Sequence, residues 1–406
     1  MPTVRVDSIA AGGDGVGRLD GLAVFVPRTA PGELVEASVR QRGRMARGRL
    51  LRVLEPSPDR VAPLCRHYDA DHCGGCQLQH LTIEAQLRAK QQIVRDAFAR
   101  IAKRQVELPP IVPSPTEWEY RSRLTLALRW QKGAWIMGLH SYDDVDRVFD
   151  LHECPITDRR VVAAWAEVRS ASRLLPRAPE LRGTIRILGE ELALVLEGGD
   201  TWASSREFAA AVPGVHVIRW RPAQGAPRVI VDRRVGGAPE EAFDQVNQPV
   251  ATEARREVVE RSLAVSPRTA IDAYAGLGAT ALALADRGVS VTAIESDSAA
   301  ARFAANHLPQ ESRSVTGRVE DVLPQFLPVD VVILNPPRGG VDARVTEALQ
   351  ELPLPRRVLY MSCDSATLAR DVSRLPAWRV TSLRAYDMFP QTAHVEVVCE
   401  LTPEGA

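Results

Sequence analysis

Long apolar runs are absent from this sequence. No stretch approaches the roughly 20 apolar residues that a membrane-spanning helix needs. The first residues, MPTVRVDSIAAGGDGVG, place Gly and Asp where a signal peptide would have its apolar core. With 45% hydrophobic and 25% charged residues, the 406-residue chain has the composition of a globular protein of two or three domains. We therefore expect a cytoplasmic monomer without a membrane partner.

Cysteine is also scarce. Six residues in 406 are too few and too unevenly spaced for a disulfide framework. Each cysteine is therefore a candidate for metal binding, for chemistry or for packing in a core.

Neither sign of charge is in excess, since 51 basic residues balance 51 acidic ones. Taken alone, this balance argues against a nucleic-acid partner. Only Lys90, Lys103 and Lys132 are lysines, so nearly all the positive charge is arginine, which suits forked phosphate contacts and stacking on bases. The distribution of arginine therefore matters more than the net charge.

Residues 1–57 alternate apolar and polar side chains in short stretches separated by Gly and Pro, which predicts a small β-barrel. This segment holds nine Arg against six acidic residues. A basic block is as often a solvated face as a binding surface, but on an OB-type barrel one basic face is the usual way to follow a phosphate backbone. Six arginines fall within residues 40–52, with no acidic residue among them: Arg40, Arg42, Arg44, Arg47, Arg49 and Arg52.

Four cysteines have the pattern of a metal site. Cys65, Cys73 and Cys76 are spaced C-x7-C-x2-C, and Cys154 lies far downstream, followed by Pro. Two glycines between Cys73 and Cys76 predict a tight turn that aims both sulfurs at one point, and a Pro often follows iron–sulfur ligands. The segment is polar and rich in Gly, so unrelated buried cysteines are the weaker interpretation. Zinc and a 4Fe-4S cluster both accept four thiolates, and the spacing alone does not separate them.

Residues 81–108 repeat apolar side chains at helical spacing and end before Pro109, which predicts a helix. Residues 115–240 then mix strands and helices without a sharp motif. One segment there interleaves aromatic and basic side chains that could hold unpaired bases, although a strand packed in a core would give the same pattern. Its residues are Trp118, Tyr120, Arg121, Arg123 and Trp130.

The last third alternates strands and helices and predicts a doubly wound sheet. Its final segments, RVTSLRAYDMF and HVEVVCEL, are two strands joined by a short loop and should form an antiparallel pair at the sheet edge. A dinucleotide-binding sheet is normally all parallel, whereas methyltransferase-type sheets end in such a pair.

The segment GLGATA, which contains Gly276 and Gly278, satisfies the G-x-G-x-x-G/A pattern, and Glu295 ends the next strand. Either NAD or S-adenosylmethionine could bind there, because both present a ribose diol to such an acid. The turn Asn335-Pro-Pro-Arg338 at the tip of a later strand favours a methyltransferase. An aromatic fourth residue would indicate methylation of an exocyclic amine, and Arg338 points away from that reaction.

Cys363 and Glu396 supply a candidate reaction. Cys363 follows an apolar strand, in MSCD, at the edge expected for the cofactor, and Glu396 is a carboxylate within an apolar strand, where burial would raise its pKa. Alternation places His394, Glu396 and Val398 on one face of that strand. These groups suit methylation of carbon 5 of a pyrimidine: a thiolate adds to carbon 6, carbon 5 takes the methyl group, and a base removes the proton from carbon 5.

The whole chain resembles the RNA 5-methyluridine methyltransferases, in the branch that has an N-terminal TRAM domain and an iron–sulfur cluster. The motifs that carry the resemblance are CGGCQLQHL, WEYRSR, FDQVNQ, DAYAGLGAT, NPPRGG, SCDSATLARD and DMFPQTAHVE. The resemblance implies a catalytic nucleophile at Cys363 and a base at Glu396. Cofactor contacts are implied at Gln245, Tyr274, Glu295 and Asn335, and cluster ligands at Cys65, Cys73, Cys76 and Cys154; Cys399 is left as a structural residue.

The chain departs from the family pattern at three places. Asn335 stands where the family usually has Asp, and the usual SCNP reads SCDS, which places Asp364 beside the nucleophile and replaces a Pro by Ser365. A nearby carboxylate would raise the thiol pKa. The spacing from Cys65 to Cys73 is also longer than the common form. These departures leave the catalytic groups in place.

We therefore predict an α/β protein of three domains: an OB-type TRAM barrel (1–57) that binds RNA, a central α+β domain with a 4Fe-4S cluster (58–240), and a Rossmann-like methyltransferase domain (241–406). The predicted activity is S-adenosylmethionine-dependent methylation of carbon 5 of a uridine in RNA, with 23S rRNA as the first expectation and tRNA as the alternative, and with the base flipped into the site. The alternatives are a methyltransferase acting on an exocyclic amine and an RNA-binding protein with a decayed methyltransferase domain.

Overall fold

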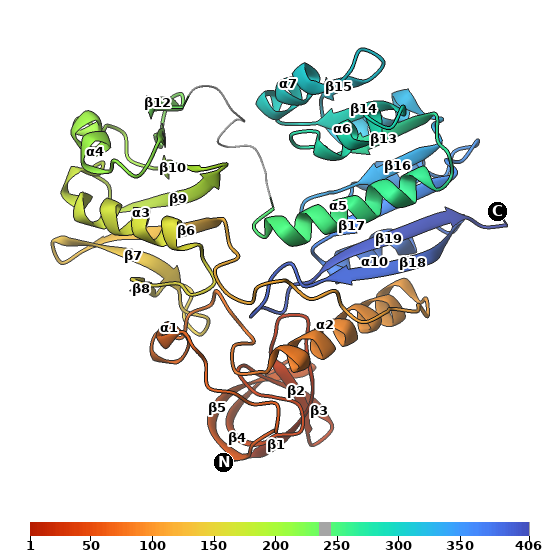
Figure 1. Ribbon diagram of the computed structural model, residues 1–406. Coiled ribbons are helices and arrows are strands. Elements are labelled where there is room, and N and C mark those ends of the chain that lie inside the picture. Colours follow the sequence, from red (N-terminus) through yellow and green to blue (C-terminus); the bar gives the residue numbers. More distant parts are fainter. Residues whose placement is uncertain (235–244, 406) are drawn as a thin grey trace.

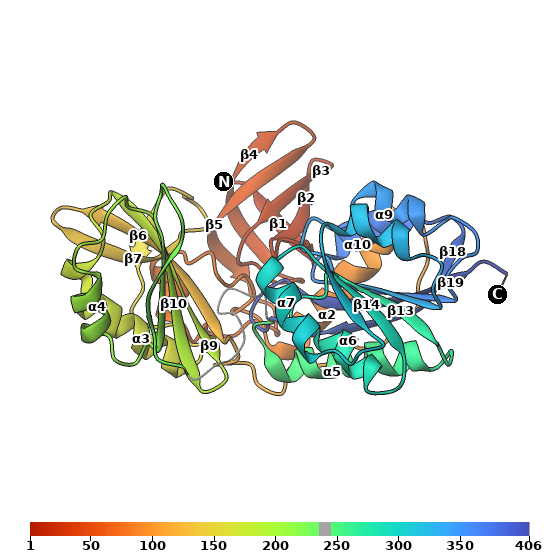
Figure 2. The same ribbon diagram turned by 90° about the horizontal axis from the view of Figure 1, so that it is seen from above.

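The computed structural model describes residues 1–234 and 245–405, which form three lobes. The N-terminal lobe lies below and between the other two in Figure 1, and between them again when seen from above in Figure 2. No helix in the described part of the chain is both long and apolar enough to cross a membrane.

The N-terminal lobe is a closed barrel with the strand order β1-β2-β3-β5-β4. Val4 and Val6, and likewise Val24 and Val26, alternate with outward-facing residues and fill its interior. At Gly17 a Cβ atom would lie 2.1 Å from the carbonyl oxygen of Arg5, so a side chain there would prevent the close approach of the first two strands. The strands are β1 (Thr3–Ile9), β2 (Gly15–Leu19), β3 (Leu22–Val26), β4 (Leu34–Arg42) and β5 (Met45–Glu55).

Two helices follow the barrel, α1 (Arg66–Ala70) and α2 (Ile83–Ala97). The hydroxyl of Thr82 caps α2 by accepting a hydrogen bond from the backbone of Ala85. The predicted helix over 81–108 is shorter than expected, because α2 passes into a π-helical turn, η1 (Phe98–Ala102), that ends where Lys103 adopts a left-handed conformation. The end of α2 and η1 pack in the core of the C-terminal lobe, and α2 lies along that lobe in Figure 1.

The central lobe contains a seven-stranded sheet with the order β12-β11-β10-β9-β6-β7-β8. Trp165 and Phe208, from its two helices, are buried in the same core as the sheet. Its elements are β6 (Arg123–Gln131), β7 (Ala134–His140), β8 (Val148–Asp150), α3 (Arg159–Ser170), η2 (Ser172–Leu174), β9 (Glu180–Leu188), β10 (Glu191–Glu197), α4 (Ser205–Ala211), β11 (Val217–Arg221) and β12 (Arg228–Asp232).

The C-terminal lobe is a seven-stranded sheet with the order β15-β14-β13-β16-β17-β19-β18, and β19 runs antiparallel to both of its neighbours. The predicted closing pair at the sheet edge is therefore confirmed. Its strands are β13 (Thr269–Ala273), β14 (Ser290–Glu295), β15 (Arg313–Thr316), β16 (Val331–Leu334), β17 (Arg357–Ser362), β18 (Trp378–Tyr386) and β19 (Glu396–Pro403). Its helical elements are α5 (Gln248–Leu263), α6 (Ala279–Ala285), α7 (Ser298–His307), α8 (Val319–Val322), η3 (Leu323–Phe326), α9 (Ala343–Ala348) and α10 (Ser365–Ser373).

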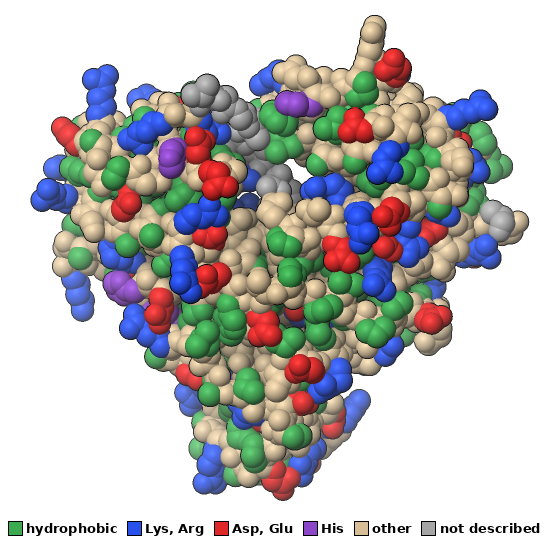
Figure 3. Space-filling model, viewed as in Figure 1, with side chains coloured by type: hydrophobic (Ala, Val, Ile, Leu, Met, Phe, Trp, Pro, Cys, Tyr) green, Lys and Arg blue, Asp and Glu red, His purple; other side chains and the backbone are tan. Residues whose placement is uncertain are grey.

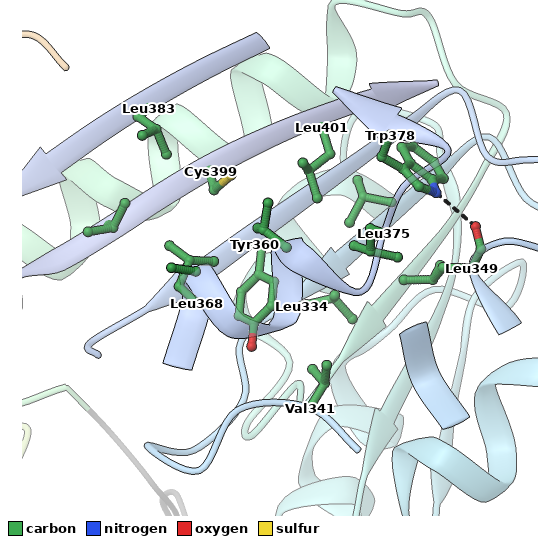
Figure 4. Packing of buried hydrophobic residues seen from close by; sticks show 14 of the residues in the cluster. Leu334, Val341, Leu349, Tyr360, Leu368, Leu375, Trp378, Leu383, Cys399 and Leu401 are labelled. Carbon is green, nitrogen blue, oxygen red and sulfur yellow. Dashed lines mark hydrogen bonds between the residues drawn. The ribbon is translucent and has the colours of Figure 1, made fainter. Parts of the chain in front are cut away.

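One face of this sheet packs against α10 and the loops around it, as Figure 4 shows. Trp378 is fully buried there, and its indole N–H donates to the carbonyl of Leu349 at 3.0 Å. Cys399 lies in this core with no exposed surface, on the face opposite Glu396, which agrees with a structural role.

Candidate active site

The predicted site residues of the C-terminal lobe gather at one edge of the sheet. Tyr274, Asn335 and Cys363 each follow the end of a parallel strand, and Glu295 is the last residue of another. The registers of β13, β14, β16 and β17 bring these ends side by side. Ligands of open α/β sheets bind at this edge.

The glycine turn after β13 is locked to Glu295. The backbone N–H of Gly276 donates to Oε2 of Glu295 at 2.8 Å, and the N–H of Asp297 donates to Oε1 at 2.8 Å. At Gly278, whose φ is +78°, a Cβ atom would lie 2.8 Å from the side chain of Ala304. The turn is therefore compact enough for a ligand to approach its backbone. Oε1 of Glu295 also accepts from the hydroxyl of Ser296 at 3.1 Å, whereas Oε2 keeps a lone pair for a hydroxyl group.

Asp272 is a polar residue of this edge that the sequence reasoning missed. It is buried in β13 and accepts a hydrogen bond from the backbone of Ala281 at 2.9 Å, which fixes the start of α6. Burial raises the pKa of Asp272 to about 7. In the sequence, the single carboxylate within the apolar strand TAIDA could have identified Asp272 as a candidate residue of this edge.

Asn335 directly follows β16, and its backbone N–H donates to the carbonyl of Ala273, the last residue of β13, at 3.2 Å. The loop that follows it is held by Asp371, a fully buried residue of α10. Oδ2 of Asp371 accepts from the backbone N–H of Val341 at 3.0 Å and from the hydroxyl of Tyr360 at 2.7 Å. The Asn-Pro-Pro-Arg turn and the helix that begins after Cys363 are therefore one connected unit.

Cys363 and Glu396 are brought together by strand pairing. The antiparallel register of β17 and β19 pairs Ser362 with Val397, and continuing it by one residue places Cys363 opposite Glu396. The thiol is half-buried. Burial and the charge of Glu396 raise the pKa of Cys363 to about 11, while the nearby charge of Arg338 opposes this rise.

Glu396 is 1% exposed, and its Oε2 has no hydrogen-bond partner among the described residues. Burial alone raises the pKa of this carboxyl to about 8. The burial and pKa direction expected from the sequence agree with the structure. An uncompensated carboxyl is costly to bury, so its retention here is a functional signal.

Two further side chains, those of His394 and Arg338, belong to this site. Burial and the charge of Arg338 lower the pKa of His394 to about 4, so the imidazole is neutral at neutral pH. The ring of His394 packs edge-on against Phe389, with centroids 5.9 Å apart. Sequence patterns placed His394 on the same face as Glu396 but gave it no role.

Gln245 lies at the junction of the lobes. Its backbone carbonyl accepts hydrogen bonds from the hydroxyl of Ser122 at 3.5 Å and from the side chain of Gln248 at 2.8 Å. Its contact with the cofactor stays a prediction.

Cys65, Cys73, Cys76 and Cys154 line one cavity of about 170 Å³, although Cys154 is far away in the sequence. The hydroxyl of Thr157 donates to the sulfur of Cys154 at 3.2 Å, and the backbone of Gly75 donates to that of Cys73 at 3.4 Å. Within residues 1–234 and 245–405, no three His, Cys, Asp or Glu side chains are arranged closely enough to hold a single metal ion. The four thiols therefore surround a space instead of converging on a point.

The aromatic and basic residues at 118–130 do not form one surface. Tyr120 is buried, and its hydroxyl donates to the carbonyl of Pro390 at 2.9 Å, whereas Trp130 is 49% exposed at the far end of β6. For Tyr120 the structure thus favours the packing interpretation.

All six arginines of residues 40–52 are exposed on the hairpin formed by β4 and β5. Two of them have acidic partners, since Arg47 lies 3.6 Å from Asp14 and Arg52 lies 3.6 Å from Glu36. Over the face shown in Figure 3, basic and acidic side chains are interspersed on all three lobes.

A Rossmann-like sheet with an antiparallel penultimate strand and a glycine turn locked to an acid is the architecture of a methyltransferase, and a thiol lies opposite a buried carboxylate at its ligand-binding edge. Comparison with known proteins identifies the family. The family model described as tRNA (Uracil-5-)-methyltransferase matches residues 298–402. The chain is 32% identical to the 23S rRNA (uracil(1939)-C(5))-methyltransferase RlmD of Thiobacillus denitrificans, over 98% of each protein.

An uncharacterized RNA methyltransferase of Thermosynechococcus vestitus is also 32% identical, over 98% of this chain and 97% of the relative. The fold is similar to that of the Pyrococcus abyssi tRNA (uracil-54, C5)-methyltransferase in complex with S-adenosyl-L-homocysteine. The TM-score is 0.73, the identity is 24%, and the match covers 99% of this chain and all of the other. The chain belongs to the RNA uracil-C5 methyltransferase family.

Proposed function

We propose that this protein transfers a methyl group from S-adenosylmethionine to carbon 5 of a uridine in ribosomal RNA, through a covalent bond between Cys363 and uracil. The observation that carries the proposal is the placement of Cys363 opposite a buried, unpartnered Glu396. Two relatives, 32% and 31% identical, are named as 23S rRNA (uracil(1939)-C(5))-methyltransferases, and they match this chain over nearly its whole length.

The chemistry follows from the two side chains. The thiolate of Cys363 forms a bond to carbon 6 of uracil, and the electrons of the C5–C6 double bond move onto carbon 5 and O4. S-adenosylmethionine supplies the methyl group to carbon 5 and leaves as S-adenosylhomocysteine. The Glu396 carboxylate then takes the proton of carbon 5, the C5–C6 double bond re-forms, and the bond from carbon 6 to sulfur breaks to release the thiolate. Arg338 favours the thiolate, since its charge lowers the pKa of Cys363.

The cofactor would lie over the glycine turn. Glu295 is held in an orientation that leaves Oε2 able to accept from a ribose hydroxyl, and Gly276 and Gly278 keep the turn open to close approach. Tyr274, Asn335 and Gln245 complete the set by family resemblance.

We assign the barrel as a TRAM domain of OB type that contacts the RNA backbone. Its parallel pairing of β3 with β5 and its closure through β1 and β4 fit that architecture. The exposed arginines of the β4–β5 hairpin provide the phosphate contacts, so the neutral net charge does not count against RNA.

We assign the four-cysteine cavity to a 4Fe-4S cluster. A zinc ion about 2.3 Å from each sulfur would draw all four sulfurs to within about 4 Å of one another. The four thiols line one cavity of about 170 Å³, which offers room for the larger cluster. The cluster would serve as a structural crosslink, because it would join the segment of Cys65, Cys73 and Cys76 to Cys154, which lies between β8 and α3 of the central lobe. Broad visible absorption bands in anaerobically purified protein would support this assignment, and colourless protein containing zinc would contradict it.

The departures from the family pattern are compatible with activity. Asp364 caps α10 by accepting from the backbone of Thr367 at 2.8 Å, which holds the start of the helix in the absence of Pro at position 365. Cys363 and Glu396, the proposed nucleophile and base, are both present and lie opposite each other, which opposes the interpretation as a decayed domain.

RNA containing 5-fluorouridine tests the mechanism. Fluorine cannot leave as a proton does, so the wild-type enzyme should remain bonded to the RNA, whereas Cys363→Ala should give no adduct and the buried-thiol control Cys399→Ala should still give one. Transcripts of 23S rRNA and tRNA, compared side by side, identify the substrate. A wild-type protein that forms no adduct with either RNA, or an equal adduct with Cys363→Ala, would refute the proposal.

A further inference from the structure

The loop that leads into Glu396 is held from outside its own sheet. We call residues 387–395, which join β18 to β19, the base loop. The carbonyl of Gln391 accepts from the backbone N–H groups of Gln77 and Leu78 at 3.1 and 3.0 Å. The Gln86 side chain accepts from the Gln391 N–H at 2.9 Å and donates to its Oε1 at 3.0 Å. These partners lie about 300 residues before the base loop in the sequence.

Lys90 makes the strongest of these contacts. Its side chain is completely buried, and Nζ donates to Oδ1 of Asp387 at 2.5 Å and to the carbonyl of Phe389 at 3.0 Å. The chain has only two other lysines, Lys103 and Lys132, and both are exposed. A compact ammonium group with three donors can bind two acceptors in a closed space that a planar guanidinium would not fit.

The contact between Lys90 and Asp387 lies at the start of the base loop, where the chain leaves β18. Tyr386 pairs with Glu396 across the two strands, and Asp387 is the next residue after that pair. The Glu396 carboxylate has no partner at Oε2 among the described residues, so its place is set by the backbone that carries it. A shift of the base loop would therefore move the carboxylate, with no side-chain contact at Oε2 to resist it.

We propose that Lys90 is a positioning residue for Glu396: through Asp387 and Phe389 it fixes the base loop so that the carboxylate can reach the proton on carbon 5. This inference rests on the proposed function. It assigns Lys90 to the last step of the reaction, the removal of that proton with release of the Cys363 thiolate. Addition of Cys363 to carbon 6 does not depend on it, because α10 and β17 hold Cys363.

The variant Lys90→Met separates these two steps. A misplacement of a catalytic group by about 1 Å costs on the order of 100-fold in rate. With ordinary uridine RNA, we expect turnover to fall by about that factor and the methylated covalent enzyme–RNA complex to accumulate, as it should in Glu396→Gln. With 5-fluorouridine RNA, the variant should be trapped at the wild-type rate, because trapping does not need the base. Lys132→Met, on an exposed hairpin, is the matched control and should behave as wild type in both assays.

A double variant, Lys90→Met with Asp387→Leu, distinguishes the loss of positioning from a loss of folding stability. Lys90→Met leaves the Asp387 carboxylate buried without its partner, which is destabilising, whereas Lys90→Met with Asp387→Leu removes both charges and should restore thermal stability. If the double variant has normal stability but releases the methylated covalent enzyme–RNA complex slowly, the result supports the role of Lys90 in positioning Glu396. Equal loss of trapping and turnover in Lys90→Met, or normal turnover in the double variant, would overturn it. Failure of wild type to be trapped would instead refute the proposed function.

Discussion

Replacing the buried base should stabilise the protein, and increasingly so as the pH rises. Burial raises the pKa of Glu396 from 4.5 to about 8, so the unfolded chain loses this proton at a much lower pH than the folded protein does. Between the two values the unfolded state binds fewer protons, and the stability of the folded state therefore falls as pH increases. Glu396→Gln removes the ionisation and with it the penalty.

The magnitude follows from the two pKa values. Each pH unit between them costs the folded state about 1.4 kcal/mol, so the penalty is about 2 kcal/mol at pH 6 and about 4.5 kcal/mol at pH 8.5. The stability gap between Glu396→Gln and wild type should widen by about 2.5 kcal/mol over that range. For a domain of this size it corresponds to about 5–10 °C in Tm.

Thermal melts at pH 6 and pH 8.5 measure this gap, with Glu400→Gln as the control on the same strand. Glu400 is also buried but is paired with Arg261 at 2.5 Å and Arg357 at 2.9 Å, so its replacement should lower the Tm. Two results would contradict this reasoning: a difference in stability between Glu396→Gln and wild type that does not change with pH, or a Glu396→Gln variant that melts below wild type at pH 8.5. Either would show that burial does not keep the Glu396 carboxyl protonated.

Three further outcomes are expected. Glu396→Gln should lower the pKa of the Cys363 thiol, because a neighbouring negative charge is removed, and site-resolved alkylation by iodoacetamide at pH 9 should become faster. Arg44→Ala with Arg49→Ala should reduce RNA affinity and lower the slope of log K against log salt by up to about 1.5, without changing S-adenosylmethionine binding. Asp371→Asn should loosen the turn after Asn335 and weaken S-adenosylmethionine binding by about 1–2 kcal/mol, as calorimetry would show.

Local patterns in the sequence were enough to predict the parts of the site. Period-two alternation in HVEVVCEL predicts that Glu396 and Cys399 face opposite sides of a strand, and the structure confirms it. The glycine turn before α6 and its acid at Glu295 were likewise predicted, because both lie within one consecutive strand–helix–strand unit, β13–α6–β14.

The relations between these parts depend on contacts that no local pattern encodes. The opposition of Cys363 and Glu396 follows from pairing between β17 and β19, which are not consecutive in the chain. The anchoring of the base loop by Lys90 joins residues 297 positions apart. An amphipathic helix such as α2 shows that it has an apolar face, but the pattern does not say that the face packs against the C-terminal sheet.

The charges of Cys363 and Glu396, the proposed nucleophile and base, influence each other. In the free enzyme each raised pKa keeps its proton bound at neutral pH, and a negative charge on one group disfavours a charge on the other. In the proposed reaction the sulfur of Cys363 becomes neutral when it bonds to carbon 6, so no thiolate charge opposes the ionisation of Glu396 in the later step that removes the proton. The proposed order of the two steps therefore avoids having both negative charges present at once.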